Sequence, residues 1–500
     1  MADKNRTQRT LLKGFAFRFA AVMLALSPFV AAEIVLRWAD WGSVTETVDP
    51  YLGFGQVHPL FELNTNANRF ETSEKRLAFF CRDSFAAEKA RNEYRIFCLG
   101  GSTVQGRPYA IETSFTTWLE LSLQAADARR RWEVVNCGGV SYASYRLINI
   151  LREVLHYDPD LVIVYTGHNE FLEDRSYQNV KQTPRLVATM HGWLSHSHFY
   201  NVCRAGWLHL RGARIGETKP PATQLPAEVD AVLDYRDGLR WYGRDDDWQR
   251  DVVEHFQFSL ERMVRVAETA GVPFVFVNPV SNLKDCPPFK AENRGDLSPR
   301  VLAEFDTLWG RAKSLDAEQE VQRLAYVQAA IAIDHRHAGA HFLKGHCLLA
   351  QRRFAEAKES FLHAKDEDLC PLRMIEPLHA AIRRVASRHG TPWVDVRQLF
   401  EEHTADGIPG KELMLDHVHP RISGHQMVAS ALLDEMVKLG IIVPQAGWQN
   451  VRARLYQKHL ATLDTPYYAR GMERLKGLQK WTQGKAPKVR REKGDAALFR

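Results

Sequence analysis

Ser102 ends the short run Gly-Gly-Ser within the motif LGGST at 99–103, directly after an apolar stretch at 94–98. Such a stretch predicts a buried strand, and the two glycines allow the backbone to turn sharply where the strand ends. The serine hydroxyl would then stand at the carboxyl end of the strand, where open α/β sheets bind their ligands. A serine becomes a nucleophile when a base takes its proton and hydrogen-bond donors stabilise the oxyanion. Ser102 is therefore the candidate nucleophile.

The base expected for this serine lies far downstream, in the motif LDHVHP. Asp416 precedes His419 by three residues, so one turn of chain can bring the carboxylate to the imidazole Nδ1 and leave Nε2 facing Ser102. His417 and His425 are rival candidates for the base. The Asp-x-x-His spacing favours His419 with Asp416 as its orienting partner.

Donors for the oxyanion are expected after two further strands. A parallel sheet brings the carboxyl ends of its strands to one edge, so the segments NCGGVSY and TGHNE should lie beside the nucleophile. The backbone N–H groups of Ser102 and Ser141 and the side-chain amide of Asn169 are the candidate donors. Gly138 and Gly139 stand just upstream of Ser141, and the donor among residues 139–141 stays open at this point.

The residues Ser102, Asn169, Asp416 and His419 occur in the chain order of the blocks of a known family, and the sequence resembles the SGNH (GDSL-like) hydrolase superfamily. The resemblance implies a flavodoxin-like three-layer α/β/α fold, a Ser–His–Asp triad and no metal or cofactor. The first block departs from the usual Gly-Asp-Ser, and the third reads Gly-His-Asn-Glu. Ser141 stands where the family has its oxyanion glycine.

Rival interpretations of the serine turn fit less well. A phosphate-binding loop requires a lysine after its last glycine, and none follows Gly106. The nucleophile elbow of α/β-hydrolases requires Gly-x-Ser-x-Gly, and Val104 occupies the last position. A purely structural Gly-Gly-Ser turn is the remaining alternative, and the ordered set of blocks argues against it.

The elements that must position these residues alternate along the chain. Alternation of strands with helices predicts a parallel three-layer α/β sheet with right-handed crossovers. The expected strands lie at 94–98, 132–136, 161–165, 273–277 and 393–396, and the expected helices at 113–128, 144–156, 251–270 and 377–389.

The first residues of the chain predict a membrane anchor. Four basic residues precede an apolar stretch at 15–35, interrupted only by Arg18, Pro28 and Glu33, and the predicted anchor at 15–37 is close to the roughly 20 residues needed to cross a bilayer. A cleaved signal peptide is the alternative, because Val30-Ala31-Ala32 resembles a cleavage site. Either interpretation places the catalytic part outside the cytoplasmic membrane, on the periplasmic side, where disulfides can form.

Two connections between the expected strands are too long for simple crossovers. The first contains the aromatic stretch 190–210, interpreted as a packed helix, with a lid or a membrane-contacting surface as alternatives. The second, at 302–372, resembles a tetratricopeptide helix pair through Gly345, Ala357, Phe361 and Ala364, whose small members allow close helix packing. This insertion is expected either to dock a protein partner or to shape the cleft.

The predicted organisation follows from these features. The segments are a cytoplasmic basic segment at 1–14, the anchor at 15–37, a stalk at 38–92, a hydrolase domain at 93–301 with an aromatic insertion at about 171–248, the tetratricopeptide-like insertion at 302–372, the second part of the hydrolase domain at 373–440 and a basic helical tail at 441–500, expected to be solvated.

Composition excludes little. The 66 lysines and arginines exceed the 60 acidic residues by only 6, which gives no argument for a nucleic-acid partner. The 7 cysteines and 20 histidines form no Cys-x-x-Cys pair and no histidine cluster of zinc spacing, so no metal is expected.

The predicted function is a membrane-anchored serine esterase or O-acyltransferase that acts on acyl groups of an extracytoplasmic glycan. Arg373 is expected to help position the substrate. The alternatives are an adaptor, in which an idle SGNH-type body presents the helical insertion to envelope proteins, and a lipid acylhydrolase.

Overall fold

The computed structural model describes residues 24, 27–39, 59–173, 197–200, 202–203 and 229–485. The chain forms two compact units. The first combines Met1–Val57 with Arg175–Leu225, and the second combines His58–Asp174 with Pro226–Arg500. The second unit holds every candidate site residue named above.

The second unit is built on a parallel sheet. Within the described residues this sheet has five strands in the order β5-β4-β6-β7-β8, and every neighbouring pair is parallel. Renumbered by chain position the order is 2-1-3-4-5, which is the flavodoxin-like order. The strands are β4 (Glu93–Gly100), β5 (Arg131–Gly138), β6 (Leu161–Tyr165), β7 (Phe274–Asn278) and β8 (Trp393–Asp395). The predicted α/β sheet is confirmed.

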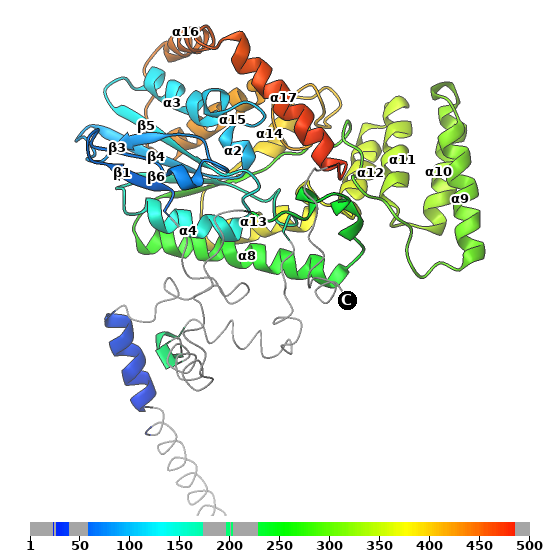
Figure 1. Ribbon diagram of the computed structural model, residues 1–500, viewed down its shortest axis with the longest axis horizontal. Helices are drawn as coiled ribbons and strands as arrows, with labels where there is room; N and C mark the ends of the chain where they lie inside the picture. The colour runs from blue at the N-terminus through cyan, green and yellow to red at the C-terminus, as the bar shows by residue number, and fades with distance from the viewer. Residues whose placement is uncertain are drawn as a thin grey trace, which may run out of the picture. The chain divides into compact units, whose positions relative to one another are not determined.

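Helices cover both faces of the sheet, which gives the three expected layers (Figure 1). One face carries α3 (Phe115–Ala126) and α15 (Ile422–Lys438), and the other carries α4 (Ser144–Val154), α8 (Asp246–Thr269) and α13 (Glu376–His389). Every residue of β6, LVIVY, is buried, as a central parallel strand covered on both faces requires. The short helices are α2 (Ser102–Gln105), α14 (Val396–Glu402), η1 (Glu74–Arg76), η2 (Ile111–Thr113), η3 (Val232–Asp234), η4 (Gly238–Trp241) and η5 (Ala317–Gln319).

The segment predicted as a stalk forms structure of its own from residue 59 onward. It contains an antiparallel sheet of β1 (Phe61–Asn64), β2 (Arg69–Thr72) and β3 (Ser84–Ala86). The Glu153 carboxylate on α4 accepts from the backbone N–H groups of Leu60 and Phe61, at 2.7 and 2.8 Å. The strands have three or four residues each, which is too short for a clear alternating pattern in the sequence.

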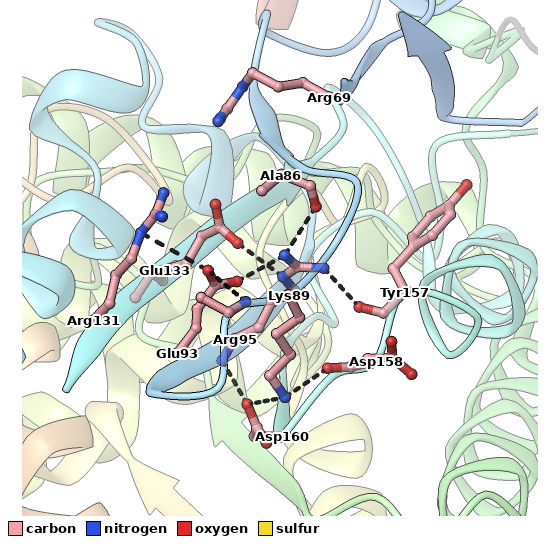
Figure 2. A network of polar contacts seen from close by, with 12 residues as sticks. Arg69, Ala86, Lys89, Glu93, Arg95, Arg131, Glu133, Tyr157, Asp158 and Asp160 are labelled. Carbon is pink, nitrogen blue, oxygen red and sulfur yellow. Dashed lines mark hydrogen bonds and ion pairs between the residues drawn. The ribbon is translucent and has the colours of Figure 1, made fainter. Parts of the chain in front are cut away.

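Arg95 ties this small sheet to the main one (Figure 2). Its buried guanidinium forms ion pairs with Glu93 at 2.7 Å and Glu133 at 2.8 Å. It also donates to the backbone carbonyls of Ala86 in β3 and Tyr157 after α4, at 2.9 and 3.0 Å. The network lies at the amino ends of β4 and β5, at the edge opposite Ser102, and its place in the fold indicates a structural role.

The insertion between β7 and α13 contains the helices α9 (Pro299–Ser314), α10 (Glu320–Ile333), α11 (Ala338–Ala350) and α12 (Phe354–Asp366). These four helices pack side by side and are drawn on the right of Figure 1. A Cβ atom at Gly345 of α11 would lie only 2.7 Å from the Phe361 ring of α12, so glycine permits this close approach. Arg336 joins the insertion to the body through its ion pair with Asp246 at 2.8 Å.

The C-terminal helices differ from the solvated tail expected from the sequence. The helices α16 (Trp448–Leu460) and α17 (Thr465–Thr482) pack on the body. The Tyr456 hydroxyl bonds the hydroxyl of Ser122 at 2.7 Å, and the Tyr467 hydroxyl bonds that of Thr113 at 2.8 Å. Buried Tyr467 and half-buried Tyr456 therefore hold a segment whose exposed face is basic.

In the first unit, residues 27–38 form a helix. The Glu33 carboxylate accepts from the Ser197 hydroxyl at 2.8 Å and from the backbone N–H groups of His198 and Phe199 at 3.1 and 2.8 Å. Among the described residues, no helix combines the length and the hydrophobicity needed to cross a membrane. Residues 15–23 and 25–26 of the predicted anchor at 15–37, and most of the aromatic stretch at 190–210, lie outside the described residues.

Candidate active site

Ser102 is the first residue of α2, at the carboxyl end of β4. The turn before it has no room for side chains. A Cβ atom at Gly100 would lie 2.2 Å from the Tyr165 carbonyl oxygen, and one at Gly101 would lie 2.4 Å from Asn169 Nδ2. The two glycines therefore let β4 pass close to β6 and let the serine stand beside the asparagine.

The structure brings Ser102, His419 and Asp416 into one hydrogen-bonded chain. His419 Nε2 lies 2.7 Å from Ser102 Oγ, and His419 Nδ1 lies 2.7 Å from Asp416 Oδ2. This arrangement leaves Nε2 able to accept the serine proton when Nδ1 donates to the carboxylate. The two segments are 317 residues apart in the chain.

Asp416 is positioned to remain ionised. Its Oδ1 accepts from the backbone N–H groups of Val418 and His419, both at 2.9 Å. Burial alone would raise the pKa of Asp416, but the charge and hydrogen bond of the His419 ring outweigh it and hold the pKa well below its usual range. A buried carboxylate that stays charged can orient the imidazole and stabilise its protonated form.

The rival histidines do not reach the nucleophile. His417 Nδ1 lies 3.5 Å from Asp416 Oδ1, whereas the His419 ring bonds Oδ2, and burial lowers the pKa of His417 to about 4. His425 Nδ1 accepts from the backbone N–H of Phe115 at 3.2 Å. Only His419 among these three histidines is hydrogen-bonded to Ser102.

The backbone around Ser141 distinguishes between the candidate oxyanion donors. The N–H of Gly139 donates to Gly100 and that of Val140 donates to Phe79, both at 2.9 Å. Among the described residues, nothing accepts from the N–H of Ser141, which lines the same pocket as Ser102. Asn169 Nδ2 donates one hydrogen to the Tyr142 carbonyl at 3.0 Å, which leaves its second hydrogen available. The geometry therefore favours Ser141 over Gly139 and Val140.

Ser141 adopts a left-handed backbone with φ of 62°, a conformation that costs an L-residue roughly 1–2 kcal/mol. We expect Ser141→Gly to keep kcat for ester hydrolysis within a few-fold, because the N–H remains in place. Ser141→Val should lose about 1–2 kcal/mol of unfolding free energy, since β-branched residues are outliers at positive φ. Urea unfolding and initial rates measure both effects.

A loss of kcat near the 10²–10³-fold expected for a missing oxyanion donor, in a folded Ser141→Gly protein, would contradict this assignment. It would mean that the serine hydroxyl, rather than its backbone N–H, contacts the reacting group.

The triad opens into a pocket of about 280 Å³. One wall of the pocket comes from α17, which contributes Arg474, Leu478 and Trp481. Another comes from Phe79, in the segment that the sequence predicted as a stalk. Sequence reasoning missed these residues. The remaining lining is largely apolar and consists of Pro108, Val140, Leu172, Val229, Leu372 and Val418 together with polar residues around the triad.

A signal for the α17 wall was present in the sequence. The buried residues Tyr467, Gly471 and Leu475 recur every four positions and mark one packed helix face. Gly471 is required there, because a Cβ atom would lie 2.1 Å from the Tyr109 ring.

Arg373, which the sequence predicts to help position the substrate, lies outside the residues that line the pocket. Its side chain is only 1% exposed and donates to the backbone carbonyls of Asn282 and Cys286, at 3.1 and 2.6 Å. These bonds hold the loop after β7, whose Phe289 ring packs edge-on against His417. A buried side chain used in this way has no direct access to a substrate.

His425 provides a test of buried titration beside the site. Burial, aided by the nearby His419 charge, lowers the pKa of His425 from 6.5 to about 3. Between these two pH values the unfolded chain binds a proton that the folded chain does not, so stability falls as the pH drops. The variant His425→Asn keeps an acceptor for the Phe115 N–H but removes the titrating group. From pH 7 to pH 4, we expect the free energy of unfolding of the parent protein to fall by up to about 3 kcal/mol more than that of this variant.

Urea unfolding at a series of pH values measures this difference, and His156→Asn, at an exposed position, is the control. Parallel pH profiles for the parent and His425→Asn proteins would contradict the prediction.

The remaining reactive groups are not arranged as a second site. All seven cysteines are free thiols, and among the described residues no group of three or more His, Cys, Asp or Glu side chains is placed to hold a metal ion.

Comparison with protein-family models gives no match, and comparison with curated proteins gives none. Solved structures do match. An α/β hydrolase, LAE5, from the metagenome of Lake Arreo shares 14% identity over 70% of this chain and 97% of its own, with a TM-score of 0.31. The acetylxylan esterase Axe2 from Geobacillus stearothermophilus shares 12% over 69% and 94%, with a TM-score of 0.31. The lipase/acylhydrolase from Enterococcus faecalis shares 11% over 71% and 100%, with a TM-score of 0.32. At such values these likenesses carry no information on substrate.

A parallel sheet with a hydrogen-bonded serine, histidine and aspartate at its carboxyl edge is the architecture of a serine hydrolase. Among serine hydrolases, three features of this structure are similar to those of a single superfamily. They are the flavodoxin-like strand order, the Asp-x-x-His pair and the asparagine beside the serine. The chain resembles the SGNH (GDSL-like) hydrolase superfamily.

Proposed function

We propose that the chain hydrolyses or transfers ester-linked acyl groups through Ser102, His419 and Asp416. The observation that carries this proposal is the hydrogen-bonded chain from Asp416 through His419 to Ser102, which opens into a pocket large enough for an acyl group. The adaptor alternative does not account for a buried, ionised carboxylate bonded to a histidine that in turn bonds a serine.

The geometry supports the following reaction. Ser102 Oγ attacks the ester carbonyl while its proton passes to His419 Nε2, and Asp416 stabilises the imidazolium. The N–H groups of Ser102 and Ser141 and the free amide hydrogen of Asn169 stabilise the oxyanion. When the C–O bond breaks, the alcohol leaves with the proton from His419, and Ser102 carries the acyl group. A water molecule or an acceptor hydroxyl then attacks the acyl-enzyme, with His419 again taking the proton.

The pocket lining suits an acylated carbohydrate as substrate. Apolar side chains face the acyl group, and Trp481 presents an indole of the kind that packs against sugar rings, held by its N–H bond to Asp234 at 2.9 Å. A lipid acyl ester is the second candidate, because the same wall is apolar. The membrane anchor, the periplasmic location and a docking role for the helical insertion stay predictions from the sequence.

Fluorophosphonate labelling tests the proposal, because these reagents phosphonylate an activated serine. We expect the full chain to be labelled on the peptide that contains Ser102. Absence of labelling in folded protein would contradict an enzyme and favour the adaptor alternative. Rates on esters from acetyl to octanoyl, measured with and without a lipid surface, would distinguish a glycan deacylase from a lipid acylhydrolase.

A further inference from the structure

Two arginines line the pocket beside the candidate nucleophile. Arg107 follows α2 and Arg474 lies on α17. Neither guanidinium forms an ion pair with a carboxylate of the described residues. Among the described residues that line the pocket, Asp234 is the only acidic one, and it accepts from the indole N–H of Trp481 at 2.9 Å. The pocket therefore contains more positive than negative charge.

Arg107 is fixed relative to Ser102. Its backbone N–H donates to the Ser102 carbonyl at 3.0 Å, and its Nε donates to Gln105 Oε1 at 2.8 Å. Gln105 in turn donates to the Phe79 carbonyl at 2.7 Å. Both terminal nitrogens of Arg107 are left to donate, within the described part of the chain, and an ordered guanidinium binds an oxyanion with little further loss of freedom.

Arg474 belongs to the wall of the pocket that α17 forms. Its Nη1 donates to the Tyr109 carbonyl at 2.7 Å, and no other described acceptor bonds its guanidinium. Burial and the nearby Arg474 charge both lower the pKa of Arg107. Two like charges held at one pocket repel each other, and an anion between them would relieve that repulsion.

We propose that the substrate is an ester that carries an anionic group, a carboxylate or a phosphate, near the ester bond, and that Arg107 and Arg474 bind this group while Ser102 attacks the carbonyl. This inference rests on the proposed function and specifies its substrate class.

The test compares 4-acetoxybenzoate with its neutral methyl ester. We expect the full chain to show a kcat/KM at least about tenfold higher for the carboxylate than for the methyl ester, since charge-assisted bonds are roughly twice as strong as neutral ones. In Arg107→Gln/Arg474→Gln this ratio should fall towards one. Arg470→Gln, at an exposed position of the same helix, should leave the ratio as it is.

A parent ratio of one or less, or an equal fall in Arg470→Gln, would overturn the proposal. Added NaCl should lower the ratio in the parent protein, because salt screens an interaction between charges.

Binding to the Ser102→Ala protein separates this inference from the proposed function. Calorimetry with 4-acetoxybenzoate should give tighter binding than with the methyl ester, and Arg107→Gln/Arg474→Gln in the same background should remove the difference. Equal binding of both esters, with hydrolysis by the parent protein, would overturn the anion site and leave the esterase. Arginine-dependent binding without any hydrolysis would support the anion site and contradict the esterase.

Two substrates distinguish the sources of such an anion. Acetylated galacturonic acid represents an acidic glycan, and dihexanoylphosphatidylglycerol represents a lipid headgroup. The substrate whose kcat/KM falls more in the double variant identifies the source, and no fall for either would overturn the proposal.

Discussion

Ser102→Ala should lower kcat for ester hydrolysis by at least about 10⁴-fold and abolish fluorophosphonate labelling, because removal of a triad nucleophile typically costs up to about 10⁶-fold. Ser102 Oγ is the only atom of this side chain that contacts His419 Nε2. Its loss removes the group that would carry the acyl intermediate and leaves only the binding and polarisation of the ester. Initial rates on a short-chain ester, with the labelled peptide read by mass spectrometry, measure the effect.

The fold should survive this change, since alanine keeps the first position of α2. Ser314→Ala, at an exposed serine of α9, is the matched control and should label like the parent protein. Ser102→Ala protein that still hydrolyses the ester within tenfold of the parent rate would contradict the assignment of the nucleophile.

Asp416→Asn should lower kcat by about 10³–10⁴-fold. The asparagine oxygen can still accept from the N–H groups of Val418 and His419, which Asp416 Oδ1 accepts at 2.9 Å. Its NH₂ group would then face His419 Nδ1 and force that atom to be the acceptor. Nε2 would carry the hydrogen and could no longer take the proton of Ser102. Single-turnover rates of acylation measure this loss directly.

His417→Asn provides the comparison, because His417 touches the same carboxylate at 3.5 Å but has no bond to the nucleophile. Its loss of kcat should be at least tenfold smaller than that of Asp416→Asn. Equal losses in the two variants would show that a disturbed loop, rather than a reversed tautomer, explains the effect.

The strands and the triad residues could be predicted from the sequence because each depends on a pattern of a few neighbouring residues. A fully buried strand such as β6 is a continuous apolar run in any sequence of this fold. The glycines before Ser102 and the Asp416–His419 spacing are short-range requirements, so each is visible within a few residues.

The walls of the pocket were not visible in the same way. The packing that brings Trp481 into the same pocket as Ser102 depends on contacts such as that of Tyr467 with Thr113, 354 residues apart. The sequence of a basic helix looks the same whether the helix is solvated or packed, unless the residues of its buried face are recognised. Arg373 shows the converse. Its position after the insertion predicted a role in positioning the substrate, and nothing in the sequence indicated the two bonds to backbone carbonyls by which its side chain holds a loop.

The wide separation of the site residues has a consequence for folding. Phe79 and Trp481, which line one pocket, come from opposite ends of the second unit. Closure of such a long loop carries an entropic cost that must be met before the contacts it permits can stabilise anything. During synthesis, the sheet strands β4 to β7 emerge long before α17, and the nucleophile precedes its base by hundreds of residues. A nascent chain therefore holds a serine without its base until His419 has been made, and the wall of the pocket that contains Trp481 forms only after α17 has packed on the body.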